Sequence, residues 1–215
     1  MEFRSVTGNY HNCTPLLNNT GDVLVCACGS TVRLVSSKTG ELLSTFDGHR
    51  HPVTCLAFDT KNPSMIYSAS LDGVVLYWNI KSCSLKKEWK LDVCVYQVIV
   101  PLTKQNEVYL VVGKSVEEST STKENDGANN GSELVITASS DFVNGSHAAQ
   151  TMGKEQYKLV CYDLLTSKIA RRLAKLHLST NSACAAILGG DEYILSINKR
   201  KLFLWNIQSS SYIGY

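Results

Sequence analysis

The amino-acid sequence predicts an all-β fold made of repeated four-stranded units. Short apolar segments recur at a spacing of 43 residues, which separates Val35 from Trp78 and Tyr162 from Trp205. The residue seven positions further along is apolar after each of the four: Leu42, Leu85, Ile169 and Tyr212. No stretch keeps the period of about 3.6 residues that an amphipathic helix requires. The repeat is therefore built from strands.

The repeat length indicates the architecture. A period near 43 residues, with short strands and turn residues between them, is typical of the four-stranded blade of a β-propeller. We expect blades at residues 11–48, 49–92, 93–177 and 178–215. The fourth blade would be cut, because Tyr215 falls in the middle of its last strand. The prediction is an incomplete ring of about four antiparallel blades.

The strands can be placed unit by unit. In the second unit they are expected at 53–59, 65–70, 74–80 and 85–90. The Asp72-Gly73 pair supplies the tight turn before the third of these strands. The third unit should have strands at 94–102, 108–113, 157–164 and 168–176, and the fourth at 183–188, 193–197 and 202–207. The first unit has a strand at 31–36, but residues 12–16 form a poor opening strand.

A polar insertion, residues 115–156, interrupts the third unit between its second and third strands. It is rich in Ser, Thr, Asn, Gly and Glu. Such a composition offers too little apolar surface to offset the entropy of ordering the chain. We expect the insertion to be mobile and to protrude from the face that carries the loops joining one blade to the next.

Charge and cysteine content narrow the class of protein. The net charge is +2, so no global field attracts nucleic acid or anionic lipid. No apolar run reaches the roughly 20 residues of a membrane span, and no signal peptide opens the chain. Most of the eight cysteines lie in apolar segments, as expected of buried free thiols in an intracellular protein. Neither cysteines nor histidines have metal-ligand spacing, so we expect no metal and no cofactor.

The second unit carries a specific motif. Gly48-His49 precedes its first strand, Ser68-Ala69-Ser70 ends its second, Asp72-Gly73 forms the turn, and Trp78 lies in its third strand. These residues resemble a WD repeat, in which four side chains form a hydrogen-bonded chain. The resemblance implies a structural tetrad of His49, Ser68 (or Ser70), Asp72 and Trp78. The third and fourth units lack the Gly-His pair.

Residues 41–90, followed by a blade with a long insertion, also resemble a family of nucleolar WD-repeat proteins. Members of this family are subunits of the UtpA (t-Utp) subcomplex of the small-subunit processome. The resemblance implies a scaffold in the nucleus and nucleolus that supports pre-rRNA transcription and the processing that leads to 18S rRNA. The alternative is an adaptor of the same fold that recruits protein partners elsewhere, for example in a ubiquitin ligase or a trafficking coat.

His49, Ser68 and Asp72 could also be taken for a catalytic triad. A nucleophilic serine needs an exposed oxygen and a nearby oxyanion hole, and no glycine-flanked elbow surrounds Ser68 or Ser70. The sequence therefore predicts a structural network and no enzyme activity. It also gives no sign of a small-molecule substrate or a membrane partner.

Basic residues are the remaining candidates for contact with a partner. Arg171 and Arg172 lie in a predicted outer strand, where cations also keep strand edges soluble. Lys199, Arg200 and Lys201 share one tight turn, where three cations repel one another. Two interpretations of this cluster are possible: a solvated turn, or a contact with RNA phosphates or an acidic partner. No aromatic residues alternate with these cations, so base-specific RNA recognition is not indicated.

Overall fold

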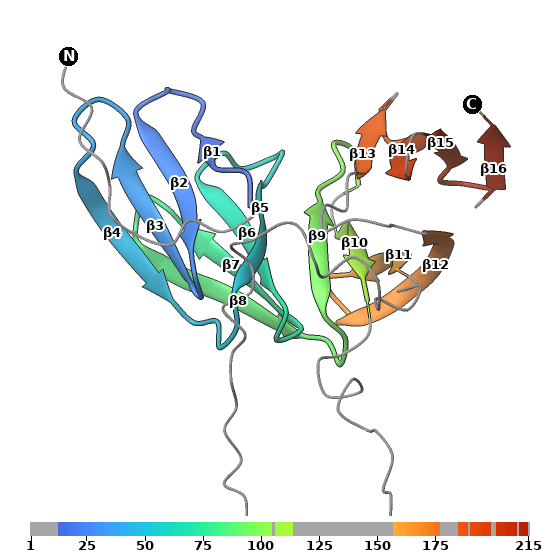
Figure 1. Ribbon diagram of the computed structural model, residues 1–215, viewed down its shortest axis with the longest axis horizontal. Coiled ribbons are helices and arrows are strands. Elements are labelled where there is room, and N and C mark those ends of the chain that lie inside the picture. The colour runs from blue at the N-terminus through green and yellow to red at the C-terminus, as the bar shows by residue number, and fades with distance from the viewer. Residues whose placement is uncertain are drawn as a thin grey trace, which may run out of the picture.

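The computed structural model describes residues 13–104, 106–113, 157–176, 185–188, 190–198, 201–209 and 211–214. Within these ranges the regular secondary structure is entirely β-strand, arranged as four antiparallel four-stranded sheets (Figure 1). The predicted all-β fold class is confirmed. No helix that could cross a membrane occurs in this described part of the chain.

The strands follow the chain sheet by sheet. The first sheet contains β1 (Leu16–Leu17), β2 (Val23–Cys28), β3 (Thr31–Ser36) and β4 (Leu42–Asp47). The second contains β5 (Val53–Phe58), β6 (Met65–Ser70), β7 (Val74–Asn79) and β8 (Ser84–Lys90). The third contains β9 (Val95–Ile99), β10 (Glu107–Val112), β11 (Tyr157–Asp163) and β12 (Lys168–Leu176). The fourth contains β13 (Ala185–Leu188), β14 (Tyr193–Asn198), β15 (Lys201–Asn206) and β16 (Ser211–Gly214).

Consecutive strands are neighbours in every sheet, as in a propeller blade. The predicted strand boundaries agree with the structure to within two residues, except that the opening strand of the third blade ends three residues earlier than predicted. The opening strand of the first blade, β1, has only two residues, which fits the poor strand signal before Leu17. The predicted insertion at 115–156 lies outside the described residues.

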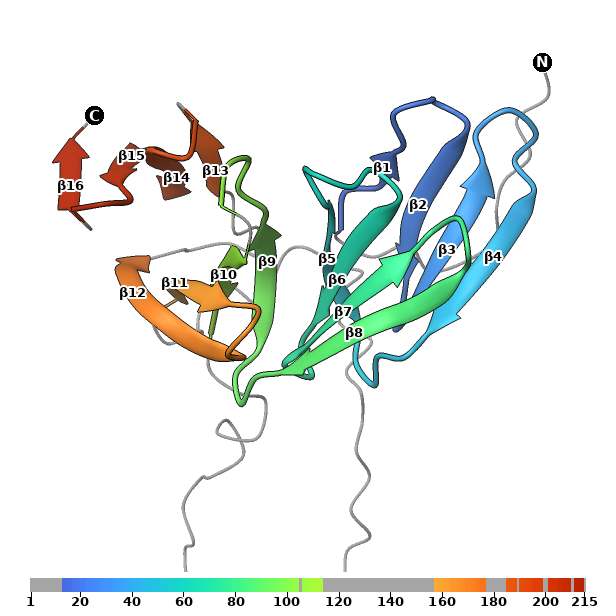
Figure 2. The ribbon, with the colours of Figure 1, turned by 180° about the vertical axis from the view of Figure 1, so that it is seen from behind.

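Apolar side chains fill the seams between neighbouring sheets. Between the first and second sheets, Phe46 stacks on Trp78 with ring centroids 4.9 Å apart and ring planes 11° apart. Trp89 and Val160 are buried between the second and third sheets, and Ile194 is buried between the third and fourth. The first and fourth sheets lie at opposite ends of the arrangement and do not meet (Figures 1 and 2). The structure is an open arc of blades.

The outer strand of every blade contains a bulge at the same place. The register with the third strand shifts beside Val35, Trp78, Tyr162 and Trp205. An extra residue at this point increases the local twist and interrupts the exposed edge of the sheet. The bulge thus occurs at the four positions that define the sequence repeat.

Candidate functional site

The second blade brings the four predicted tetrad residues together. His49 lies in the loop before β5, Ser68 in β6, Asp72 in the turn between β6 and β7, and Trp78 in β7. The Trp78 indole N–H donates to Ser68 Oγ at 2.9 Å, and His49 Nε2 lies 2.8 Å from the same oxygen. His49 Nδ1 lies 3.5 Å from Asp72 Oδ2, which is longer than a good hydrogen bond.

These contacts favour one position of the histidine proton. Because Ser68 Oγ accepts the Trp78 N–H, its own hydrogen is available for donation to His49 Nε2. The ring proton is then on Nδ1, facing the Asp72 carboxylate. The opposite tautomer would place a lone pair of the ring against a carboxylate oxygen. The chain of polar atoms therefore runs from indole through hydroxyl and imidazole to carboxylate.

Burial and hydrogen bonds set the charges of this chain. Burial lowers the pKa of His49 below its ordinary value, although Asp72 acts to raise it, so the ring is neutral near pH 7. Burial acts to raise the pKa of Asp72. The backbone N–H groups of Arg50 and Val74, each 2.8 Å from the carboxylate, outweigh that effect and hold the pKa of Asp72 below its ordinary value.

Ser70 has a separate role. Its hydroxyl donates to the His51 carbonyl oxygen at 2.8 Å and accepts the Asp72 backbone N–H at 3.3 Å. Both serines are fully buried on the same strand, but only Ser68 contacts the imidazole. The choice between Ser68 and Ser70 that the sequence left open is therefore resolved by position along the strand.

Two glycines let the loops close around the tetrad. A Cβ atom on Gly48 would lie 2.8 Å from Leu76 Cδ1 and 3.2 Å from the Trp78 ring. Gly73 has a φ of +75°, and a Cβ there would lie 2.1 Å from the Leu91 carbonyl oxygen. The Gly-His and Asp-Gly pairs of the motif thus reflect close approach of backbone to side chain and of backbone to backbone.

The tetrad holds its atoms where a substrate cannot reach them. Ser68 Oγ is fully buried and engaged by both Trp78 and His49. Within the described residues, no group of three His, Cys, Asp or Glu side chains could hold a metal ion. The geometry therefore suits fastening of the loops of the second blade rather than nucleophilic chemistry.

The described basic residues of the prediction lie in two strands, β12 and β15. Arg171, in β12, lies 3.5 Å from Glu107 Oε2, an oxygen that also lies 3.3 Å from Lys104 Nζ. Its neighbour Arg172 is exposed. The backbone of Lys201 opens β15. Lys199 and Arg200 lie outside the described residues.

Asp191 makes a contact between blades that no sequence pattern indicated. It sits in the turn between β13 and β14 with a φ of +73°, and it is buried. Its carboxylate accepts the backbone N–H of Leu102 at 2.8 Å, and the backbone N–H and hydroxyl of Thr103. Burial acts to raise the pKa of Asp191, but these bonds outweigh it and lower the pKa. Asp191 thus ties the fourth blade to the third.

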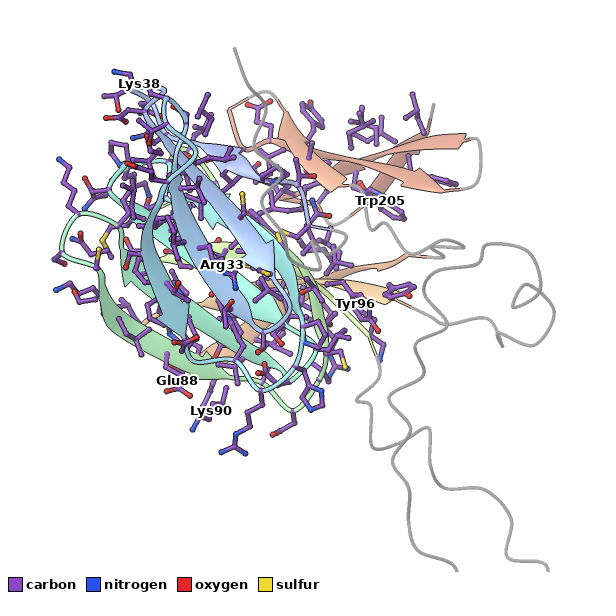
Figure 3. All side chains as sticks on the ribbon, turned by 60° about the vertical axis from the view of Figure 1, so that its left-hand side comes forward. Arg33, Lys38, Glu88, Lys90, Tyr96 and Trp205 are labelled. Carbon is purple, nitrogen blue, oxygen red and sulfur yellow. The ribbon has the colours of Figure 1, made fainter. Side chains whose placement is uncertain are left out.

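The second and third blades are fastened at their outer side. The carbonyl oxygen of Leu164, the residue after β11, accepts hydrogen bonds from Lys87 Nζ at 2.8 Å and from the Trp89 indole N–H at 3.1 Å. Lys87 also lies 4.9 Å from the centre of the Trp89 ring. On the same outer strand, Glu88 and Lys90 form an exposed ion pair at 3.2 Å (Figure 3). Two of the three seams between blades therefore have polar contacts of their own.

Comparison with known proteins identifies relatives of this arrangement. Residues 16–125 match the family described as the first β-propeller of WD repeat-containing protein 75. WD repeat-containing protein 75 of Danio rerio is 29% identical over 98 residues, and that of Xenopus laevis is 28% identical over 101 residues. Periodic tryptophan protein 2 of Saccharomyces cerevisiae is 34% identical over 125 residues.

The aligned regions cover 46%, 47% and 55% of this chain, respectively. They cover only 12% of each relative, so the likeness concerns one part of much longer proteins. The family match spans more than half of the chain and includes the complete tetrad. This chain belongs to the family of the first β-propeller of WD repeat-containing protein 75.

Proposed function

We propose that this protein is a non-catalytic scaffold subunit of a nucleolar ribosome-assembly complex, the small-subunit processome. In this role it supports pre-rRNA transcription and the processing that leads to 18S rRNA. The observation that carries the proposal is the family match over residues 16–125. The resemblance of residues 41–90 to UtpA subunits, drawn from the sequence alone, points the same way. Its partners are the protein subunits of the assembly, and contact with pre-rRNA is indirect or through the RNA backbone.

The geometry supports a binding role. The polar chain of the second blade is sealed from solvent, with Ser68 fully buried and His49 only 8% exposed. What the blades present outward are strand edges and loops, the surfaces that scaffolds of this fold offer to other proteins. A small-molecule substrate, a cofactor and a membrane have no part in the proposal.

The proposal is tested by location and by rRNA processing. The intact protein, tagged in cells of its source organism, should be nucleolar and should co-purify with processome subunits. Its depletion should lower 18S rRNA while 28S (or 25S) rRNA is maintained, because the proposed complex acts on the small-subunit precursor. A cytosolic or vesicular location with normal 18S rRNA would instead favour an adaptor of a ubiquitin ligase or a trafficking coat.

Contact with the pre-rRNA backbone has its own test. If Lys199, Arg200 and Lys201 meet phosphates, replacing all three with glutamine should weaken RNA binding by the intact protein. The dependence of the binding constant on salt should also become shallower, by about two to three phosphate contacts. An unchanged slope would assign these residues to a solvated turn. Arg171 is a weaker candidate than Arg172, since Glu107 already neutralises it.

A further inference from the structure

The outer edge of the third blade differs from the other blade edges. Its strand β12 has nine residues and is the longest strand in the described part of the chain. It is the last strand in its sheet, so no described strand pairs with its outer side. One row of backbone N–H and C=O groups along β12 is therefore open to another strand.

The charge of this edge has one sign. The sequence of β12 contains Lys168, Arg171, Arg172 and Lys175 and no acidic residue. By contrast, β8 contains three lysines and Glu88, while β4 and β16 contain no cation. Lys168 and Arg172 are exposed, and neither forms an ion pair with a described residue, whereas Glu107 pairs with Arg171.

An apolar side chain accompanies these charges. Ile169 is 41% exposed and pairs across the sheet with Tyr162, while Arg172 pairs with Val160. Tyr162 and Val160 both face the second blade, so Ile169 and Arg172 share that face. Lys168 pairs with Asp163 and lies on the opposite face. The edge offers one apolar contact and a cation on either side of the strand.

We propose that the outer edge of β12 binds a short, extended, acidic segment of a partner protein, which adds a strand to the third blade. This inference rests on the proposed scaffold function and specifies one kind of partner. Backbone hydrogen bonds would supply affinity, and acidic side chains opposite Lys168 and Arg172 would supply selectivity. The two bulges in the β11–β12 pair prevent a long flat extension, so the segment that fits is short.

A polypeptide fits this edge better than RNA. An RNA backbone has no pattern of donors and acceptors that matches the open edge of a strand. β12 also contains no aromatic residue on which a base could stack. Only two of its described cations lack a carboxylate partner, which is few for a surface that holds RNA through phosphates alone.

The test uses the intact protein and a fluorescent seven-residue peptide, Glu-Glu-Val-Glu-Glu-Val-Glu, which places glutamates on both faces of an extended strand. The peptide should bind, and Lys168→Glu combined with Arg172→Glu should weaken binding about tenfold or more, because two charge-assisted contacts become repulsive. The matched control is Lys86→Glu with Lys90→Glu on β8, which makes the same charge change on another outer strand. The control should change binding less than about twofold. All variants should melt at the temperature of the unmodified protein.

A second peptide separates strand addition from charge attraction. N-methylation of alternate residues keeps the charge but removes the backbone donors, and should weaken binding about tenfold. Equal binding of both peptides, equal loss in the β8 control, or binding of oligouridine in place of the acidic peptide would overturn the inference. If the protein is nucleolar but ignores the peptide, this inference alone fails. If the protein never enters the nucleolus, the proposed function fails whatever the peptide does.

Discussion

The second and fourth blades have the same strand order but are held in different ways. The second blade has a complete tetrad and is packed between two neighbours. The fourth has no Gly-His pair, and its described link to the third blade includes the carboxylate of Asp191. The strands of a blade therefore form without the tetrad, and the tetrad adds a fixed arrangement of its loops.

One repeated position makes the contrast quantitative. Val32, Val75 and Leu159 lie three residues before the repeat positions Val35, Trp78 and Tyr162. Each is at most 2% exposed, because the next blade covers it. The equivalent Leu202 in the fourth blade is 49% exposed, since no described sheet covers that face. All four blades have an apolar residue at this position. The fourth blade therefore presents, at Leu202, an apolar side chain of the kind that the other blades bury against a neighbour.

The largest expected effect is the difference in stability between substitutions at Leu159 and at Leu202. Leu159→Lys should cost more than about 4 kcal/mol, because it places an unpaired charge in a sealed seam. Leu202→Lys should change stability by less than about 0.5 kcal/mol. It should also reduce self-association of the isolated 215-residue chain, which we expect to aggregate through its uncovered face. Denaturant titration and size-exclusion chromatography measure the two effects. Equal costs at the two positions, or a monodisperse chain that melts cooperatively, would contradict the comparison.

The next effect concerns the tryptophan at the repeat position. Trp78→Ala should cost about 3–5 kcal/mol, because it leaves a cavity against Phe46 and removes the donor to Ser68. Trp205→Ala, the matched change in the fourth blade, should cost clearly less, because Trp205 is only half-buried. Thermal unfolding of both variants gives the comparison. A larger loss at Trp205 would mean that the fourth blade carries more of the stability than its exposure indicates.

The sequence predicted the strands because their signals are local: apolar periodicity, turn residues and a 43-residue repeat that is lengthened by the insertion in the third unit. It predicted the members of the tetrad because the motif is specific. The sequence could not distinguish Ser68 from Ser70, because residues two apart lie on the same face of a strand and differ only in their position along it. Asp191 was missed because its partners, Leu102 and Thr103, lie 89 and 88 residues away. Such a contact depends on how blades pack, which no local pattern encodes.

A smaller effect is expected at the turn of the tetrad. Asp72→Ala should cost about 1–3 kcal/mol, because the part-buried Val74 N–H and the buried His49 imidazole lose their acceptor. Asp163→Ala is the matched control in an exposed turn, where the carboxylate accepts the Leu165 N–H at 2.8 Å. It should cost less, because water replaces the lost acceptor. A loss below about 0.5 kcal/mol at Asp72 would place it in an ordinary solvated turn.

The same carboxylate should make stability depend on pH. The folded-state pKa of Asp72 lies below its ordinary value, so its stabilising effect is present above the unfolded pKa of about 3.9. That effect is lost as the pH falls through the folded-state pKa. Asp191 acts in the same direction for the fourth blade. Asp72→Asn should therefore reduce the loss of unfolding free energy at acid pH. An unchanged loss would mean that other carboxylates cause the acid dependence.

The smallest effect should come from removing the insertion. Val112 pairs with Lys158, and Gly113 packs beside Tyr157, whose ring meets Tyr96 edge-on at 4.8 Å. The chain therefore leaves and re-enters the third blade at adjacent positions, and a turn of about four residues can replace residues 114–156. Each halving of a flexible loop lowers its closure cost by only about 0.6 kcal/mol, so the shortened protein should gain at most about 2 kcal/mol. Limited proteolysis of the unmodified protein should cut first within 115–156. A large loss of stability on deletion would show that the insertion packs on the blades, and that the third blade, unlike the second, depends on more than its four strands.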